Sequence, residues 1–322
     1  MSELNAITIP TYEEVKNAYL KIRDKVHRTP VLNSKKVNER AGGELFFKCE
    51  NFQKVGAFKF RGATHAVGEL SDEEAQNGVA THSSGNHAQA VALAAKLRGI
   101  AAHIVMPENA PKVKVNAVRD YGATITFSES TQEGREATLK KVVEETGATF
   151  IHPYDNPHII MGQASAAIEL LEEKPDLDYI IAPIGGGGLM SGTSIAASGL
   201  SPETKIIGTE PEVANDAYLS FKTSELHPVQ STDTVADGLR TSLSPLTFAC
   251  IQEHVDAIYT VTEQEIIDAM RFIWERMKII IEPSCAVPVA AVFNGKIDLQ
   301  GKRAGIIITG GNMDLDQLPW QG

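Results

Sequence analysis

A lysine in an unusual local context gives the first indication of chemistry. Lys59 lies in the segment Gly56-Ala-Phe-Lys-Phe-Arg-Gly-Ala63, among aromatic and small residues rather than on a polar face. Partial desolvation lowers the pKa of a lysine and favours the neutral amine, which can form a Schiff base with a carbonyl compound. On its own this signal is weak, because a lysine near apolar residues usually extends its stem along the protein surface.

Four successive glycines give a second indication. Gly185–Gly188 follow the apolar segment Tyr179–Ile184 and precede Leu189–Ala197, a segment of mostly small residues that we predict to be helical. A glycine turn between a strand and a helix exposes backbone N–H groups at the helix N-terminus, where the helix dipole adds positive charge. These donors suit a phosphate dianion. The chain has no G-x-x-x-x-G-K-[ST] motif, which disfavours a P-loop nucleotide hydrolase.

The same glycines leave a second interpretation open. Gly186, Gly188 and Gly192 are followed by Glu210, at the end of the predicted strand Lys205–Gly208, and this spacing imitates a dinucleotide-binding fingerprint. A nicotinamide-dependent oxidoreductase is therefore an alternative hypothesis. It does not explain the lysine segment, nor the serine-rich segment that follows another predicted strand.

Two further polar segments follow predicted strands. Thr81-His-Ser-Ser-Gly-Asn-His87 precedes a predicted helix that either Ser83 or Ser84 could cap, and the free N–H groups of that helix could bind a carboxylate. Thr309-Gly-Gly-Asn312 follows a β-branched run near the C-terminus. Because the carboxyl ends of parallel strands open onto one edge of a sheet, we expect these turns and the glycine turn to lie close together.

The elements that must position these motifs alternate between strand and helix. Short β-branched runs predict strands, and segments of helical period separate them. The predicted strands include residues 78–81, 102–106, 123–127, 179–184, 205–208 and 305–309, and the predicted helices include residues 86–97 and 132–145. This alternation predicts an α/β fold with mostly parallel, buried strands.

The predicted strands fall into two groups along the chain. One group lies before residue 154 and the other after residue 178, and the segment Pro153–Pro157 joins them. We therefore predict a small domain of residues 75–154 inserted into a large domain of residues 1–74 and 155–322. A length of 322 residues agrees with two domains of about 100 to 200 residues each.

Charge and composition exclude several classes of function. The net charge of −11 and the lack of a basic run disfavour a nucleic-acid partner. The chain has no signal-peptide pattern at its start and no stretch of 18 apolar residues, so we expect a cytoplasmic protein without a membrane partner. Three widely spaced cysteines, Cys49, Cys250 and Cys285, form no C-x-x-C pair and are expected to be reduced core residues.

Taken together, the motifs resemble those of a known enzyme family. Ala57–Gly62, Ser83–His87, Gly185–Gly188 and Thr309–Asn312 resemble, in order and spacing, the fold type II pyridoxal-phosphate (PLP) family of serine/threonine dehydratases and serine racemases. The resemblance covers nearly the whole chain, beginning at Arg28-Thr-Pro-Val31. It implies an α/β fold of two open, mostly parallel sheet domains with flanking helices, similar to the β-subunit of tryptophan synthase.

The resemblance implies a PLP site. Lys59 would bind the cofactor covalently, the four glycines would hold its phosphate, Asn86 would bond the ring hydroxyl and Thr309 the pyridine nitrogen. A hydroxyl at that position leaves the nitrogen largely unprotonated, which favours elimination of a β-leaving group. The implied cofactor-binding residues are Phe58, Lys59, Asn86, Gly185, Gly186, Gly187, Gly188, Leu189, Gly238 and Thr309.

The resemblance also implies a substrate site and a reaction. The catalytic residues would be Lys59 and Ser84, two acid/base groups on opposite faces of the cofactor ring, which makes racemisation possible alongside elimination. The implied substrate-binding residues are Ser83, Ser84, Gly85, Asn86, His87 and Arg135. The expected reaction converts serine, threonine or 3-hydroxyaspartate into a keto acid and ammonia. The alternatives are an enzyme that is mainly an amino-acid racemase and a protein that binds PLP or amino acids without catalysis.

The sequence also contains less specific signals for a metal ion and for ATP. Glu210 and Asp216, with an intervening backbone carbonyl, supply the hard oxygen ligands that Mg²⁺ or Ca²⁺ prefers. In the racemase branch this stretch resembles a divalent-cation site for Mg²⁺, Ca²⁺ or Mn²⁺, with Ala214 contributing its carbonyl. By the same resemblance the chain would form a homodimer and act on a small amino acid. Possible ATP-binding positions are Lys54, Lys114 and Tyr121.

Overall fold

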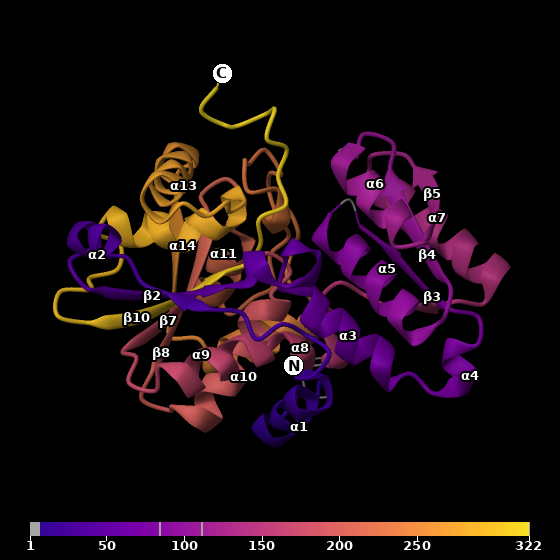
Figure 1. Ribbon diagram of the computed structural model, residues 1–322, viewed down its shortest axis with the longest axis horizontal. Coiled ribbons are helices and arrows are strands. Elements are labelled where there is room, and N and C mark those ends of the chain that lie inside the picture. The colour runs from indigo at the N-terminus through magenta and orange to yellow at the C-terminus, as the bar shows by residue number, and fades with distance from the viewer. Residues whose placement is uncertain (1–6, 84, 111, 322) are drawn as a thin grey trace.

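A six-stranded sheet forms the centre of the larger part of the molecule (Figure 1). The computed structural model describes residues 7–83, 85–110 and 112–321. The strand order is β1-β2-β10-β7-β8-β9, and all neighbours are parallel except β1 and β2. These strands are β1 (Val31–Leu32), β2 (Glu44–Cys49), β7 (Tyr179–Pro183), β8 (Lys205–Pro211), β9 (Ala257–Val261) and β10 (Arg303–Ile308).

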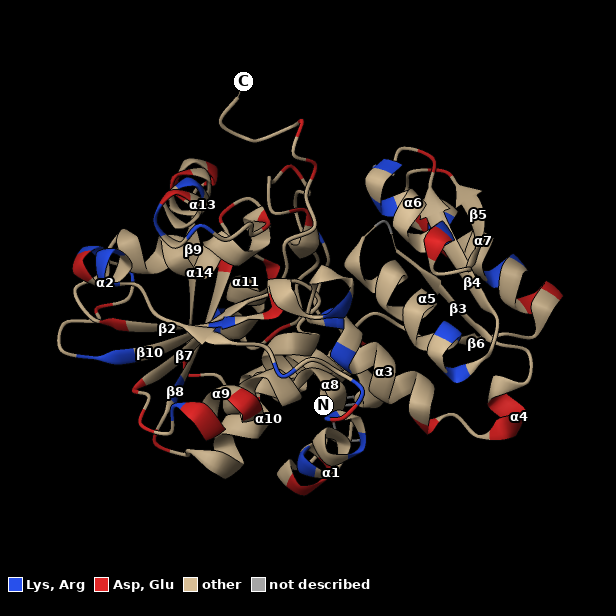
Figure 2. Ribbon diagram, in the orientation of Figure 1, with Lys and Arg blue, Asp and Glu red and all other residues tan. Residues whose placement is uncertain are grey.

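Both faces of this sheet are buried, which explains the continuous apolar runs in its strands. Side chains alternate between the faces, as the pleat of a strand requires. Ile180 and Ala182 of β7 belong to the apolar cluster on one face, and Ile181 belongs to the cluster on the other. Figure 1 shows α13 and α14 over one face and α9 and α10 over the other. The helices α10 and α14 contain no charged residue, and both appear tan in Figure 2.

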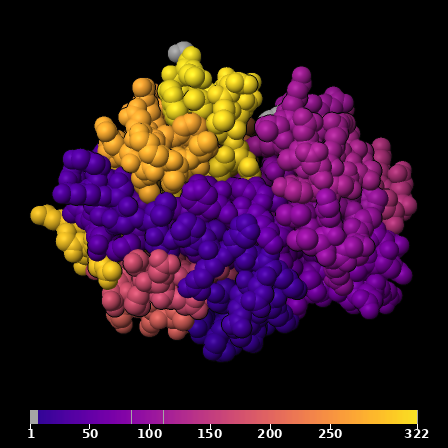
Figure 3. Space-filling model, in the orientation of Figure 1, coloured from indigo at the N-terminus to yellow at the C-terminus, as the bar shows by residue number. Residues whose placement is uncertain are grey.

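A second, four-stranded sheet lies in the other part of the molecule, on the right of Figure 1. Its order is β5-β4-β3-β6, and all its strands are parallel. The strands are β3 (Val79–His82), β4 (Ala102–Pro107), β5 (Thr124–Ser128) and β6 (Thr149–Phe150). The predicted α/β fold with two mostly parallel sheets is therefore confirmed. On the face shown in Figure 3, the surface is indented between this part and the yellow C-terminal segment.

Helices connect and cover the two sheets. In the first half of the chain they are α1 (Tyr12–Ile22), α2 (Lys35–Ala41), α3 (Lys59–Glu69), α4 (Asp72–Ala75), α5 (Asn86–Arg98), α6 (Lys112–Asp120) and α7 (Gln132–Thr146). In the second half they are α8 (Pro157–Gln163), α9 (Ser165–Glu173), α10 (Gly188–Leu200), α11 (Asp216–Thr223), α12 (Pro245–His254), α13 (Glu263–Met277) and α14 (Pro283–Phe293). Within the described ranges, no helix has the length and apolarity that a membrane crossing requires.

A buried group of charges fixes the start of α3 against the large sheet. Arg61 Nε lies 2.6 Å from a carboxylate oxygen of Glu50, and Arg61 Nη2 lies 2.8 Å from Glu169 of α9. Lys48 of β2 lies 2.6 Å from the same Glu169. All four side chains are at most 1% exposed. Since Arg61 follows Lys59 by two residues, this network holds the lysine segment in place.

Candidate active site

Lys59 is the first residue of α3, and its amine points toward the segment that follows the second sheet. Lys59 Nζ donates a hydrogen bond to the carbonyl of Pro153 at 3.1 Å, and it lies 5.2 Å from the ring centre of Phe58. Burial lowers the pKa of Lys59 to about 8, and the negative charge of Glu282 opposes this shift. A substantial fraction of the amine is therefore neutral near physiological pH, as nucleophilic chemistry requires.

Backbone contacts bring the Lys59 segment and the segment after β10 together. Phe58 N donates to the carbonyl of Thr309 at 2.9 Å, and Gly311 N donates to the carbonyl of Gly56 at 3.0 Å. The Thr309 hydroxyl lies 3.2 Å from the thiol of Cys285 at the start of α14. The two segments are about 250 residues apart in the chain, yet they meet at one edge of the sheet, as the strand-end rule predicts.

Two neighbours, Tyr154 and Gly238, connect the glycine turn to the rest of the site. Gly187 has a φ of +84° and caps the N-terminus of α10, a conformation that glycine adopts without strain. A side chain on Gly186 would overlap the ring of Tyr154, whose chain neighbour Pro153 contacts Lys59. On the other side, a Cβ on Gly185 would lie 2.9 Å from the carbonyl of Gly238. The predicted phosphate site therefore has glycine at positions where close neighbours leave no space for a side chain.

Asn86 is held in one orientation by two partners. Its Nδ2 donates to Glu282 at 2.9 Å, and its Oδ1 accepts from Asn312 Nδ2 at 2.9 Å. Burial raises the pKa of Glu282 to about 7, with the nearby charge of Asp237 adding to the shift. Sequence reasoning assigned no role to Glu282. Its only local signal was a carboxylate directly before the proline that opens α14.

Among the described residues, no side chain caps the N-terminus of α5. Gly85 is the N-cap residue and provides no side-chain cap, while the Ser83 hydroxyl accepts from Gly85 N at 3.2 Å. Of the two predicted caps, Ser83 does not bond the helix, because its hydroxyl bonds within the turn instead. Ser84, the predicted second acid/base, lies outside the described residues. The bare first turn remains suited to a carboxylate.

His87 lies inside this site with a fixed proton arrangement. It is 2% exposed, and its Nε2 lies 3.1 Å from the carbonyl of Ile151. Because a carbonyl only accepts, Nε2 carries the proton, and Nδ1 has no partner among the described residues. Burial, together with the charge of Lys59, keeps the pKa of His87 well below its usual value. The ring is therefore neutral. Because its one N–H already bonds Ile151, the backbone N–H of His87 is the group of this residue that suits a substrate carboxylate.

The predicted substrate residue Arg135 lies in the first turn of α7. Its charge contributes to the lowered pKa of His82, after the larger effect of burial, so the guanidinium lies near the end of β3. Arg135 Nε is buried without a hydrogen-bond partner in the described part of the chain. His152 and Tyr154, which sequence reasoning did not select, lie in the adjacent segment after β6. Their rings are 4.7 Å apart.

The predicted metal residues lie between the end of β8 and α11. Glu210 is 1% exposed and accepts from the backbone N–H groups of Ala217 and Tyr218, at 3.1 and 2.7 Å. Asp216 is also 1% exposed; one of its oxygens accepts from Leu243 N, and the other is buried without a partner in the described residues. Burial raises the pKa of Asp216 to about 7 and that of Glu210 well above its usual value.

This arrangement fits a divalent cation, and the packing of Gly192 disfavours the nicotinamide interpretation. A cation would satisfy the orphaned oxygen of Asp216 and offset the repulsion between two buried carboxylates. Each oxygen of Glu210 accepts one backbone N–H group and keeps a lone pair for a cation. A Cβ on Gly192 would lie 2.5 Å from the carbonyl of Ile160, so that glycine permits close packing of α10 on α8 rather than cofactor binding.

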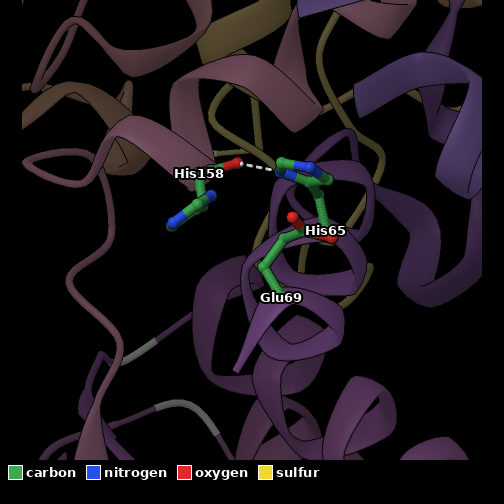
Figure 4. Close-up of side chains that lie close together, drawn as sticks. All are labelled: His65, Glu69 and His158. Carbon is green, nitrogen blue, oxygen red and sulfur yellow. Dashed lines mark hydrogen bonds between the residues drawn. The ribbon is translucent and has the colours of Figure 1, made fainter. Parts of the chain in front are cut away.

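A second cluster of possible metal ligands lies outside this region, where α3 meets α8. His65, Glu69 and His158 have ligand atoms within 4.8 Å of one another (Figure 4). His65 Nδ1 already bonds the carbonyl of His158 at 2.8 Å, and Glu69 forms an ion pair with Lys21 at 2.6 Å. Since His65 and Glu69 already have these protein partners, we assign no metal to the cluster.

Two of the three predicted ATP positions, Lys54 and Lys114, have internal partners. Lys114 Nζ lies 2.6 Å from Asp237, so it joins α6 to the turn that contains Gly238. Lys54 Nζ donates to the carbonyl of Lys25 at 2.7 Å. Burial raises the pKa of Tyr121 above its usual value. ATP binding stays a prediction.

Comparison with known proteins shows which family this chain resembles in sequence and in structure. The family model described as "Pyridoxal-phosphate dependent enzyme" matches residues 22–310. A β-hydroxyaspartate dehydratase of Paracoccus denitrificans is 51% identical over 97% of this chain and 99% of its own length. An L-threo-3-hydroxyaspartate ammonia-lyase of Saccharomyces cerevisiae is 48% identical over 95% of this chain and 94% of its own. The structure of maize serine racemase has a TM-score of 0.94 and 44% identity, covering 96% of this chain and 95% of that one.

The residues present fit the cofactor of that family. Lys59 offers an amine with a lowered pKa, and the glycine turn offers a bare helix N-terminus of the kind that binds phosphate. Pro153 and Tyr154 join these two features in space, since one contacts the amine and the other the turn. With its sequence matched over nearly its full length and its site built to suit the cofactor, this chain belongs to the family of pyridoxal-phosphate-dependent enzymes.

Proposed function

We propose that this chain is a PLP-dependent ammonia-lyase that removes water and ammonia from a small β-hydroxy amino acid: serine, threonine or 3-hydroxyaspartate. The observation that carries the proposal is the position of Lys59: its amine of lowered pKa bonds Pro153, whose neighbour Tyr154 lies against the glycine turn, and its charge acts on His87 at the predicted carboxylate site. The names of the relatives in Paracoccus and Saccharomyces support 3-hydroxyaspartate as a substrate.

The chain's own residues account for substrate binding and proton transfer. Bound PLP supplies an aldehyde that combines with amines and a ring that withdraws electrons from Cα. The bare first turn of α5 binds the substrate carboxylate, and the neutral Lys59 amine takes the proton from Cα. The β-hydroxyl then leaves as water, taking up the proton that Lys59 removed from Cα. The unsaturated amine that results adds water and gives a keto acid and ammonia.

The visible absorption spectrum of the purified protein tests this proposal. We expect a yellow band that shifts when serine, threonine or 3-hydroxyaspartate is added, together with keto acid in the same cuvette. A protein that stays colourless after PLP is added would contradict cofactor binding. A yellow protein that releases no keto acid from any of the three substrates would instead support the non-catalytic alternative.

Racemisation is a second candidate activity, and the likeness to the structure of maize serine racemase favours it. It would need a second acid/base group opposite Lys59, for which we propose Ser84 on the basis of the sequence. Incubation of enantiopure serine, followed by chiral analysis of the recovered amino acid, tests this activity. Recovery of a single enantiomer after extensive turnover would argue against it.

We also propose a divalent cation, Mg²⁺ foremost, bound by Glu210, Asp216 and the carbonyl of Ala214. The orphaned oxygen of Asp216 supports this proposal. We propose residues 75–154 as the small domain, because all four strands of the second sheet fall within them. The homodimer and the cytoplasmic location stay predictions from the sequence.

A further inference from the structure

We infer that His152 determines specificity by donating a hydrogen bond from Nε2 to a second carboxylate on the substrate, next to the charge of Arg135. The inference deepens the proposed function, since it rests on an amino-acid substrate bound near Lys59. It selects 3-hydroxyaspartate, a dicarboxylate, over serine and threonine.

The proton of His152 is fixed by the turn in which it lies. His152 Nδ1 accepts hydrogen bonds from the backbone N–H groups of Tyr154 and Asp155, at 3.3 and 2.8 Å. A nitrogen that accepts two N–H groups carries the lone pair, so in the neutral ring the proton lies on Nε2. This N–H has no hydrogen-bond partner among the described residues. The turn thus presents one unused donor at a fixed position.

His152 is close to the reacting groups. The next residue, Pro153, accepts the hydrogen bond from Lys59 Nζ at 3.1 Å. Burial is the main reason that the pKa of His152 falls to about 4; the charge of Asp155 opposes this shift, and the charges of His82 and Lys59 add to it. His152 is therefore a neutral donor beside the amine at neutral pH. A neutral donor adds directionality without repelling a neighbouring cation.

Arg135 supplies the charge that a second carboxylate needs. Within the described residues it forms no ion pair, and its buried Nε has no partner. The ring of Phe150 lies next to both His82 and His152, with ring centres 6.0 and 5.5 Å away, and Arg135 is near enough to His82 for its charge to lower the pKa of that ring. The guanidinium of Arg135 and the Nε2–H of His152 both lie near His82, and together they suit a carboxylate, which accepts hydrogen bonds from both kinds of donor. Serine and threonine carry no group that would use them.

A pair of substitutions separates the donor from the turn. In His152→Asn, the side-chain oxygen takes the place of Nδ1 and can still accept from the two backbone N–H groups, but the donor at Nε2 is lost. In His152→Gln, the amide nitrogen reaches the place of Nε2, while the acceptor of the turn is lost. His103→Asn, on β4 of the same sheet, is a matched control away from the site.

Steady-state kinetics of the holoenzyme give the first readout. We expect H152N to lower the ratio of kcat/KM for 3-hydroxyaspartate to kcat/KM for serine by roughly 10- to 100-fold, the effect of a hydrogen bond to a charged group. H152Q should restore part of the ratio, and H103N should leave it unchanged. A role limited to the turn would leave H152N close to the wild type and would lower both kcat/KM values equally in H152Q. Equal losses, or an unchanged ratio in H152N, would overturn the inference.

Binding of unreactive acids gives a readout that does not depend on turnover. The wild-type holoenzyme should bind succinate more tightly than propionate, measured by calorimetry, and H152N should weaken succinate binding alone. Wild-type protein that binds the two acids equally would overturn the inference. Failure of the proposed function has a different signature, namely no keto acid from any of the three β-hydroxy amino acids while succinate is still preferred.

Discussion

The enclosed amine of Lys59 sets the pH range in which the protein takes up its cofactor. Its pKa of about 8 lies below the ordinary value of 10.5, because burial disfavours the charged form. Only the neutral amine attacks the aldehyde, and its fraction rises with pH. The rate at which cofactor-free protein reacts with PLP should therefore increase through about pH 8 and level off above it, measured by the growth of the yellow band in a stopped-flow instrument.

Lys59→Ala provides the control for this pH profile. The variant should bind PLP without the yellow band and should lose essentially all turnover, at least about 1,000-fold, because it lacks both the nucleophile and the proton acceptor. A reaction midpoint near pH 10.5 in the wild type would mean that the amine is solvated. Substantial turnover by K59A would show that another residue takes the Cα proton.

Several residues of the site could be predicted from sequence, and others could not. Lys59 and the glycine turn stand out because unusual residue types are adjacent in the chain. Glu282 and His152 do not, since their importance comes from neighbours far away in sequence. Glu282 contacts Asn86, which lies 196 positions earlier, and such a pairing leaves no local pattern.

At the level of elements, the junction between β8 and α11 forms a unit that a cation would complete. Removing bound Mg²⁺ leaves the carboxylates of Glu210 and Asp216 buried together, with one oxygen of Asp216 unsatisfied. Dialysis against EDTA should therefore lower Tm by several degrees, which corresponds to about 1 to 2 kcal/mol for a chain of this size, and added Mg²⁺ should restore it.

Asp216→Asn distinguishes this site from general effects of EDTA. The variant lacks one ligand charge, so its Tm should respond to neither EDTA nor Mg²⁺. A wild-type Tm that is insensitive to both reagents would show that the two carboxylates are stable without a cation. A variant that responds as the wild type does would place the cation elsewhere.

The strands and helices were the most predictable part of the fold. Buried parallel strands such as β7 and β10 are continuous β-branched runs, and their boundaries agree with the predicted ones within a few residues. The two-residue strands β1 and β6 are too short to give a pattern. The sequence could not exclude Ser83 as the cap of α5, because serine and glycine are both favourable near a helix start and side-chain geometry decides between Ser83 and Gly85.

At the scale of the whole molecule, the buried charge network links residues 48–61 to α9, which lies about 100 positions later in the chain. Arg61 contacts both Glu50 and Glu169 with no exposure to solvent. Removing one member of such a group leaves a buried charge without its partner. Arg61→Ala should therefore lower the free energy of unfolding by roughly 3 to 5 kcal/mol, measured by urea denaturation.

An exposed ion pair in the same protein supplies the comparison. Arg271 and Glu275 form a helical pair in which both side chains are about half exposed, so Arg271→Ala should cost less than about 0.5 kcal/mol. Arg61→Lys keeps the charge but loses the forked geometry, and its stability should fall between those of the other two variants. Similar losses in R61A and R271A would show that the buried network contributes little to stability.

The residues around Lys59 divide by chain segment. Except for Asn86, the residues that we propose for the cofactor lie outside residues 75–154, whereas the residues that we propose for the substrate lie within them. On this proposal, substrate preference is encoded mainly in one continuous stretch of about a quarter of the chain. Exchanging that stretch with a relative's would transfer the choice of amino acid in a single step and leave the machinery that activates it in place.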